Sequence, residues 1–358
     1  MPPLDTTGRT TSFFEFWPSW LMYFPVLLQW LVLGLRYRSL SLPLIANPAI
    51  PLSGMVGVPK SAVFDAAGPE ARQRILPWVI YPVDRRPAGQ QCQSVMTALS
   101  GAGLALPLVA KPNLGCRGAG VKLIADTAAL EDYLREFPAN GDIQFQQLAP
   151  WEPEAGVFWV RYPGEVRGQI TSLTLKYTPY VVGDGIATLG QLVARDPRAG
   201  RLLHLYQQRH RAQWDRVLRA GEAFRLVFSA SHCRGAVFRD GRQYITEALC
   251  QSLDRFFDQI PGFHYGRLDI KFRDLESLIA GEGIAVIEIN GASAESIHIW
   301  DRNTTLLAAL GTLLRQYRTL YALGDANRRL GHRPPGLMAL WKAWRLESGL
   351  SRHYPAND

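Results

Sequence analysis

Apolar and polar residues alternate in two stretches late in the chain, residues 266–272 and 286–291. Such alternation predicts strands, because side chains two positions apart on a strand point to the same face. One face of the first strand would carry Arg267, Asp269 and Lys271, and one face of the second Val286, Glu288 and Asn290. If the strands are neighbours, Asp269, Glu288 and Asn290 form a set of oxygen ligands of the kind that Mg²⁺ prefers. The alternative is a pair of amphipathic strands whose charges are solvated.

A glycine-rich stretch lies upstream, in residues 108–121. A short apolar strand leads to Lys111, and Gly115, Gly118 and Gly120 follow in a predicted turn. Glycines allow backbone N–H groups to approach a phosphate, and a lysine adds a positive charge. The stretch lacks the ending of a Walker loop and the spacing of a dinucleotide fingerprint. By itself it indicates a turn, and together with the downstream carboxylates it indicates a phosphate site.

The order of these motifs resembles the ATP-grasp superfamily, within it the D-alanine–D-alanine ligase-like branch of carboxylate–amine ligases. The resemblance covers roughly residues 105–300. It implies an α+β fold in which two α+β subdomains clasp ATP, preceded by a reduced α/β N-terminal domain and an apolar N-terminal segment. We expect the apolar segment in residues 1–38, the reduced substrate domain in 39–105, the ATP-grasp lid in 106–185, the second ATP-grasp half in 186–302 and an amphipathic helical tail in 303–358.

The same resemblance implies roles for individual residues. The phosphates of ATP would be held by Lys111, Gly115, Arg117, Gly118 and Gly120, and the terminal phosphates also by Lys176. Magnesium would be held by Asp269, Glu288 and Asn290, and Arg267 would face the reacting carbonyl oxygen. Adenine would be read by Gln146, Gln147 and Leu148, and the ribose by Glu154. The chain departs from the family at the hinge, where the usual glutamate is replaced by glutamine.

Five further residues are candidates for substrate contacts: Arg161, Asp184, His232, Ser293 and Ser296. A surface ion pair is an equal alternative for Arg161, and a structural role is the commoner one for a loop histidine such as His232. The implied reaction is ATP-dependent, ADP-forming ligation of a carboxylate to an amine through an acylphosphate. Phosphoryl transfer or ligation to a thiol on the same fold is the first alternative. A non-catalytic nucleotide-binding membrane protein is the second.

Composition narrows the possible partners. The 358 residues include 39 Lys and Arg against 31 Asp and Glu, a net charge of +8. A basic surface can meet nucleic acid, anionic lipid or an anionic substrate, but the sequence shows no nucleic-acid-binding module. The four cysteines have no CxxC pairing, which is typical of a reducing compartment and argues against a disulfide framework and a zinc site. The branch also makes a homodimer possible.

The N-terminal segment is the second unusual feature. Residues 13–35 are mostly large and apolar, and two arginines follow at once. The segment is long enough to span a bilayer, but Glu15, Gln29 and two prolines argue against a regular span. Its tryptophans favour the membrane interface. The arginines that follow it and the expected use of ATP would place the protein in the cytoplasm at the inner face of the membrane. Packing on the protein itself or in a dimer interface is the alternative.

Two other segments have open interpretations. Gly54, Gly57, Lys60 and Ser61 would form either an anion-receiving turn at a helix start or an ordinary capped loop. Residues 336–346 combine apolar residues, tryptophans and cations, as an interfacial helix does. A terminal helix that covers the core is the alternative for this segment.

Overall fold

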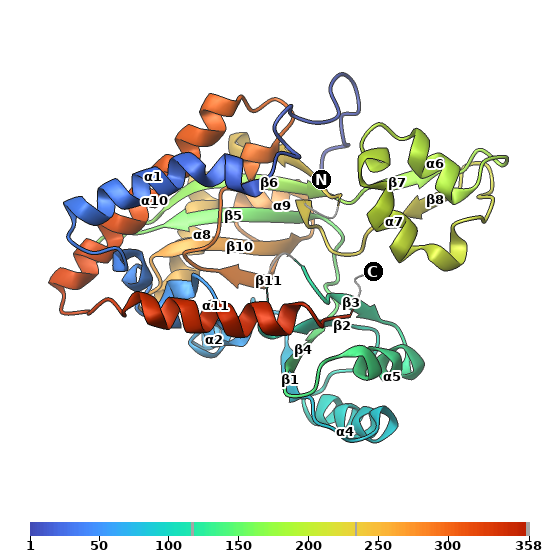
Figure 1. The fold of residues 1–358 in the computed structure, drawn as a ribbon, viewed down its shortest axis with the longest axis horizontal. Helices are drawn as coiled ribbons and strands as arrows, with labels where there is room; N and C mark the ends of the chain where they lie inside the picture. Colours follow the sequence, from blue (N-terminus) through green and yellow to red (C-terminus); the bar gives the residue numbers. More distant parts are fainter. Residues whose placement is uncertain (116–117, 233–234, 356–358) are drawn as a thin grey trace.

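The computed structural model describes residues 1–115, 118–232 and 235–355. Two antiparallel sheets, each with helices against it, form the main body, and a smaller lobe projects from one side (Figure 1). The α+β class expected from the sequence is therefore confirmed.

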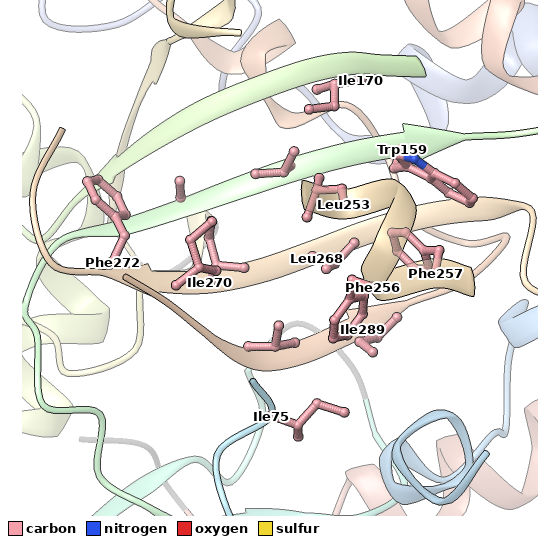
Figure 2. Packing of buried hydrophobic residues seen from close by; sticks show 14 of the residues in the cluster. Ile75, Trp159, Ile170, Leu253, Phe256, Phe257, Leu268, Ile270, Phe272 and Ile289 are labelled. Carbon is pink, nitrogen blue, oxygen red and sulfur yellow. The ribbon is translucent and has the colours of Figure 1, made fainter. Parts of the chain in front are cut away.

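The central sheet has five strands in the order β11-β10-β5-β6-β9, and every pairing in it is antiparallel. Its strands are β5 (Glu154–Val160), β6 (Gln169–Tyr177), β9 (Val237–Asp240), β10 (Tyr265–Phe272) and β11 (Ile284–Asn290). Side chains alternate between its two faces. On one face, Trp159, Leu268 and Ile270 pack against Leu253 and Phe257 of α8 (Glu247–Asp258), as Figure 2 shows. The short helix α9 (Leu275–Ala280) contacts α8.

The opposite face of the central sheet is divided between a second helical layer and polar residues. Phe158 and Tyr265 pack against Leu320 and Leu323 of α10 (Leu306–Arg329). The N-terminal helix α1 (Ser19–Arg36) lies along α10 (Figure 1). By length and apolar composition α1 could cross a membrane, although the fold uses one of its sides to pack on α10.

The second sheet has four strands in the order β1-β4-β2-β3. They are β1 (Trp78–Pro82), β2 (Leu108–Pro112), β3 (Lys122–Ile124) and β4 (Asp142–Gln147), with α4 (Ala88–Gly101) and α5 (Thr127–Glu136) packed on one face through a core of their own. The smaller lobe contains β7 (Tyr180–Val182), α6 (Leu189–Arg195), α7 (Leu203–Arg209) and β8 (Ala223–Arg225) around a third core. Asp126 caps α5, and Thr188 with Gln191 forms a capping box on α6.

The sheets cross two of the expected segment boundaries. The strand β1 was expected in the substrate domain of residues 39–105, but it pairs with β4. Strands β5 and β6 were expected in the lid of residues 106–185, but they lie in the central sheet beside β10. Hydrogen-bond pairing between strands that are distant in the sequence sets these boundaries. The local sequence pattern predicts a strand but does not predict its pairing partner.

The segment before β1 is made of short helices. It contains 3₁₀ turns at Leu42–Ile45 and Pro51–Gly54, then α2 (Lys60–Asp65) and α3 (Pro69–Arg72), and an isolated parallel bridge joins Ile75 to Val286. Further 3₁₀ turns occur at Ala199–Leu202, Arg211–Gln213, Arg242–Tyr244 and Ile297–Trp300. The last helix, α11 (Leu337–Ser351), runs across the front of α2 toward β2 and β3 (Figure 1).

Candidate active site

A cavity of about 970 Å³ is bordered by both sheets. Lys111 and Gln146 line it from the four-stranded sheet, and Lys176 and Asp269 line it from the central sheet. The N-terminal segment and α11 supply further walls. The volume is in the range of pockets that bind small ligands.

Asp269 lies at the centre of a buried charge cluster in this cavity. Its two carboxylate oxygens accept hydrogen bonds from Nε and Nη2 of Arg267 at 2.9 and 3.1 Å, and Nζ of Lys176 lies 3.0 Å from Oδ1. Burial by itself would raise the pKa of the Asp269 carboxyl, but Arg267 and Lys176 outweigh it and lower the pKa to about 2. Asp269 is therefore a carboxylate at neutral pH.

Gly156 makes room for this cluster. It is the β5 residue paired with Asp269. A Cβ at this position would lie 2.8 Å from Cδ1 of Ile297 and 3.3 Å from Oδ1 of Asp269. A side chain here would therefore displace either the carboxylate or the Ile297 side chain.

The expected set of oxygen ligands is brought together by the pairing of β10 with β11. Asp269 pairs with Glu288, and Arg267 pairs with Asn290. Nδ2 of Asn290 lies 3.4 Å from Oδ2 of Asp269. The prediction that Val286 shares a face with Glu288 and Asn290 is wrong. A β-bulge shifts the register after Asp269, and the Val286 side chain lies in the apolar core. The same bulge presents the carbonyl oxygen of Ile287 to Lys111.

Lys111 is buried at the centre of the opposite wall. Its ammonium group donates to Oε1 of Gln146 and to the carbonyl oxygen of Ile287, both at 2.8 Å. Burial lowers the pKa of Lys111 to about 8, and attraction by Glu288 partly opposes that effect. A lysine with this pKa gains its charge readily when an anion approaches.

The glycine-rich loop follows Lys111 and also lines the cavity. Gly115 and Gly118 are cavity residues, whereas Gly120 packs behind them, where a Cβ would lie 2.7 Å from Cγ of Pro112. All three have a φ between +68° and +150°, which favours glycine. Arg117, the fourth expected loop contact, and Cys116 lie outside the described residues.

The hinge residues are only partly placed as expected. Gln146, Gln147 and Leu148 all line the cavity. The side-chain amide of Gln146, however, already binds Lys111 and donates to the carbonyl oxygen of Leu76 at 3.2 Å. In this structure Gln146 positions Lys111, and its proposed contact with adenine stays a prediction.

Glu154 has a different setting from the expected ribose contact. It lies on β5, 7% exposed, and its oxygens meet Lys176 at 3.0 Å and Lys271 at 3.1 Å. Burial would raise its pKa, but the two lysines outweigh burial and lower it. Glu154 thereby orients Lys176 toward Asp269, while Glu152, two residues earlier, is the exposed carboxylate at this end of the cavity.

Of the five candidate substrate contacts, Ser293 and His232 line the cavity. The Ser293 hydroxyl donates to the carbonyl oxygen of Gly54 at 3.0 Å. Nε2 of His232 lies 2.9 Å from Oε1 of Glu15, and its ring stacks on Trp300 with centroids 4.9 Å apart. These contacts make His232 a link between the N-terminal segment and the cavity wall.

The other three candidates are not among the residues that line the cavity. Arg161 forms an ion pair with Asp258 at 2.6 Å, the alternative foreseen for it. Asp184 accepts hydrogen bonds from the backbone N–H groups of Ile186 and Ala187 at 2.9 and 2.6 Å, and so shapes its own loop. Ser296 is 1% exposed at the start of a 3₁₀ turn. A sequence pattern assigns loop residues to a site only by analogy, and the packing of the loop decides where they point.

The possible anion turn before α2 is closed by another loop. The N–H of Lys60 donates to the carbonyl oxygen of Asn113 at 2.7 Å, and the N–H of Ser61 donates to Oδ1 of Asn113 at 3.0 Å. Asn113 therefore occupies both amides, which argues against an anion-receiving turn here, although the N-cap residue Pro59 makes no side-chain cap. The Lys60 side chain nevertheless enters the cavity, where Nζ contacts the carbonyl oxygen of Gly115 and lies 3.8 Å from Glu288.

The sequence did not predict that two of the helices line the cavity. Met22 and Tyr23 of α1 form one wall, and the Tyr23 hydroxyl donates to Glu295. Trp344 and Glu347 of α11 form the other, and Glu347 accepts a hydrogen bond from the N–H of Gly57 at 2.6 Å. Both helices lie far from the motifs along the chain, so only the tertiary structure brings them to the cavity.

The residues expected to hold magnesium fit that ion in their chemistry. Among the described residues, no group of three or more His, Cys, Asp and Glu side chains could hold a metal by itself. The candidate set has two carboxylates and one amide, and Mg²⁺ in such sites commonly completes its shell with water and substrate phosphates. The Glu288 side chain keeps 29% of its surface exposed toward the cavity, while Arg267 and Lys176 already engage Asp269.

Comparison with known proteins finds likeness only among solved structures. No protein-family model matches the chain, and no curated protein matches it. The chain is similar to solved structures whose titles name ligases and synthetases, at low TM-scores and low sequence identities. The D-Ala:D-Ser ligase VanG from Enterococcus faecalis matches at a TM-score of 0.41 and 10% identity, over 77% of this chain and 64% of that one.

Two further structures show the range of these matches. The D-alanine–D-alanine ligase from Bacillus anthracis matches at a TM-score of 0.40 and 12% identity, over 79% of this chain and 72% of that one. A bifunctional glutathione synthetase from Pasteurella multocida matches at a TM-score of 0.36 and 14% identity, over 72% of this chain. This chain spans only 35% of the synthetase.

Proposed function

We propose that the chain is an ATP-dependent carboxylate–amine ligase that forms ADP. The observation that carries the proposal is the buried cluster of Lys176, Arg267 and Asp269, which shares one cavity with Lys111 and the glycine-rich loop. A polyphosphate needs fixed positive charge, and Lys111, Lys176 and Arg267 supply it in this cavity. A carboxylate substrate needs activation, because its oxygen is a poor leaving group.

The proposed reaction has two steps. The substrate carboxylate oxygen attacks the γ-phosphorus of ATP, the bond to the β,γ-bridging oxygen breaks, and ADP and an acylphosphate form. The amine then attacks the acyl carbon, phosphate leaves with the C–O electron pair, and the amine loses a proton. The products are an amide, ADP and inorganic phosphate, which balances the atoms and charges.

The chain's own residues have distinct tasks in this scheme. Lys111 and Lys176 offset the charge of the phosphates, and approach of the nucleotide keeps Lys111 protonated despite its lowered pKa. Arg267 faces the cavity and would stabilise the oxyanion of the second step, a role worth roughly 10²–10³ in rate. Asp269, Glu288 and Asn290 would hold Mg²⁺, which would supply further neutralisation of phosphate charge.

The proposal includes a location at the cytoplasmic face of a membrane. Support comes from α1, whose side away from α10 exposes large apolar residues, among them Trp20, Phe24 and Leu35. Tryptophan and phenylalanine on the outer side of a helix suit the lipid headgroup region.

The test is release of ADP and phosphate by the purified, detergent-solubilised protein with Mg-ATP. Amino acids and lipid-like carboxylates are supplied singly and in pairs with amines. Release that requires both a carboxylate and an amine supports the ligase. Release with a carboxylate or alcohol alone indicates a phosphotransferase, and release only with a thiol indicates a thiol ligase. ATP binding without stimulated release from any pair would contradict the proposal.

A further inference from the structure

The outward side of α1 is apolar from residue 20 to residue 35. Between residues 20 and 35, every exposed side chain of this helix is apolar: Trp20, Leu21, Phe24, Leu27, Leu28, Leu31, Val32 and Leu35. The inward side packs through Met22, Val26 and Leu33 on neighbouring elements that include α10. A helix on the surface of a soluble protein ordinarily has polar residues on its outward side. A continuous apolar surface of this kind marks a binding surface.

Arginines gather at the C-terminal end of the same helix. Arg36 and Arg38 border a hollow of about 420 Å³ with Arg328 and Arg329 of α10. Asp325 is the carboxylate in this hollow, and it pairs with Arg328 and Arg329. Arg36 and Arg38 are exposed. The end of the apolar surface therefore carries excess positive charge, which complements the phosphates of anionic lipids.

The helix α11 has the same mixture of residues. Leu337, Met338, Trp341, Trp344 and Leu346 are about half exposed or more, and Lys342 and Arg345 are interleaved with them. Every residue of α11 keeps part of its surface exposed. Both α1 and α11 line the cavity of the candidate active site, so two helices with exposed apolar residues flank it.

The outer cavity walls add large apolar side chains to the charged inner walls. The inner walls carry Lys111, Lys176 and Asp269, whereas the walls from the N-terminal segment and α11 carry Trp17, Met22 and Trp344 beside the polar residues Glu15, Glu347 and Ser348. Large apolar side chains next to a charged region suit a substrate with a polar reacting end and an apolar body.

We propose that the chain docks on an anionic bilayer through the outward side of α1, and that one substrate is an amphiphile reaching the cavity from that bilayer. The docking stands by itself, whereas the amphiphilic substrate rests on the proposed ligase function. Since α10 covers the inward side of α1, the helix lies in the plane of the membrane interface with its apolar side among the acyl chains.

Docking is tested by flotation with vesicles of phosphatidylcholine, with and without an equal part of phosphatidylglycerol. The full chain should float with the anionic vesicles. Leu27→Glu/Leu31→Glu should weaken binding at least about 100-fold, because charges replace two leucines that docking would bury among the acyl chains. Arg36→Gln/Arg38→Gln should weaken binding to anionic vesicles by roughly 30-fold and leave binding to phosphatidylcholine alone unchanged.

The matched control places two glutamates on apolar residues of the smaller lobe, away from α1 (Figure 1). Val182 and Ile186 are 52% and 84% exposed there, and Val182→Glu/Ile186→Glu should float as the unchanged chain does. Thermal melting confirms that each variant is folded. Unchanged flotation of Leu27→Glu/Leu31→Glu would overturn the docking. So would a lipid-free dimer, seen in analytical ultracentrifugation, that the same variant converts to monomers, because the surface would then be a dimer interface.

The substrate is tested by ADP release with dodecanoate or dodecylamine in the anionic vesicles, each with the complementary soluble amino acids. Butyrate and butylamine are the short-chain controls. At least about tenfold faster release with one long-chain probe is expected, from the apolar surface its extra methylenes bury. Equal rates with short chains, or release with amino-acid pairs alone, would overturn the amphiphile and leave the ligase standing. No stimulated release from any pair would instead overturn the ligase function, while flotation would still decide the docking.

Discussion

The ammonium nitrogen of Lys176 on β6 lies 3.0 Å from Oδ1 of Asp269 on β10, although β5 separates the two strands in the sheet. Both side chains are more than nine-tenths buried. Gly156 of the intervening strand pairs with both Thr174 and Asp269 and has no side chain to block the contact. Burial opposes the charge of Lys176, but Asp269 and Glu154 outweigh burial and raise its pKa. The charged state of each partner thus depends on the other.

Substitution of Asp269 should destabilise the fold much more than substitution of Glu288. Asp269→Asn leaves Arg267 without its carboxylate in a buried site and leaves Lys176 with Glu154 alone, so we expect a loss of about 3–5 kcal/mol in the free energy of unfolding. Glu288→Gln should leave stability nearly unchanged, because its side chain is 29% exposed and lies 3.8 Å from Lys60. Both variants should lose at least about 100-fold in ADP release, since both belong to the proposed magnesium site. Urea unfolding and steady-state assays measure the two effects, and full activity in both variants would contradict the site assignment.

Nucleotide affinity should fall as the pH rises above about 8. The pKa of Lys111 is lowered to about 8 by burial, so the free protein loses this charge in that range. A bound polyphosphate favours the charged form and raises the pKa, so binding at pH values somewhat above 8 should take up a proton.

Calorimetric titration of ATP in two buffers of different ionisation enthalpy measures this uptake. Lys111→Gln is the control, because it should weaken binding and abolish the uptake. An uptake that persists in Lys111→Gln would assign the proton to another group.

Gly120→Ala should weaken ATP binding, whereas Gly103→Ala, which causes similar backbone strain, should not. Gly120 has a φ of +68° and an added Cβ would lie 2.7 Å from Cγ of Pro112. Gly103 has a φ of +70°, but an added Cβ would meet no atom within 4 Å. Both alanines should cost about 1–2 kcal/mol of backbone strain, and Gly120→Ala alone should weaken ATP binding, by roughly tenfold. Equal ATP affinity in the two variants would argue against a role of the loop in phosphate binding.

Stability should fall as the pH drops from about 6.5 to about 4. Burial lowers the pKa of both His264 and His298 to about 4, from an ordinary value near 6.5. In this window the unfolded chain binds protons that the folded chain excludes, so each histidine contributes stability that is present at higher pH and lost as the pH falls.

The expected slope is about 1.4 kcal/mol per pH unit for each histidine. Nδ1 of His298 lies 2.7 Å from Oγ of Ser172, and Asp240, Asp301, Arg242 and Arg315 surround it. Urea denaturation between pH 4 and 7 measures the slope, and His298→Gln should reduce it by about half. An unchanged slope in that variant would exclude His298 as a source.

The local pattern of the chain determined a large part of this description. Alternation predicted the strands that carry Arg267, Asp269, Glu288 and Asn290, because a strand's side chains have a period that can be read from the sequence alone. The glycines after Lys111 likewise predicted a turn, since a positive φ is a local property of those residues.

Only the tertiary structure decided which residues meet. The bulge in β11 moved Val286 into the core, and strand pairing carried Lys176 to Asp269. Arg161 and Asp184 were candidates because of their positions along the chain. In the fold, Arg161 instead pairs with Asp258, and Asp184 accepts a hydrogen bond from the N–H of Ala187. The sequence by itself determined the motifs and the apolar N-terminal segment, because these depend on neighbours along the chain, and the resemblance of the motifs implied the α+β class. The sheet boundaries, the walls from α1 and α11 and the partners of Lys111 depend on contacts between residues far apart, which the fold alone brings together.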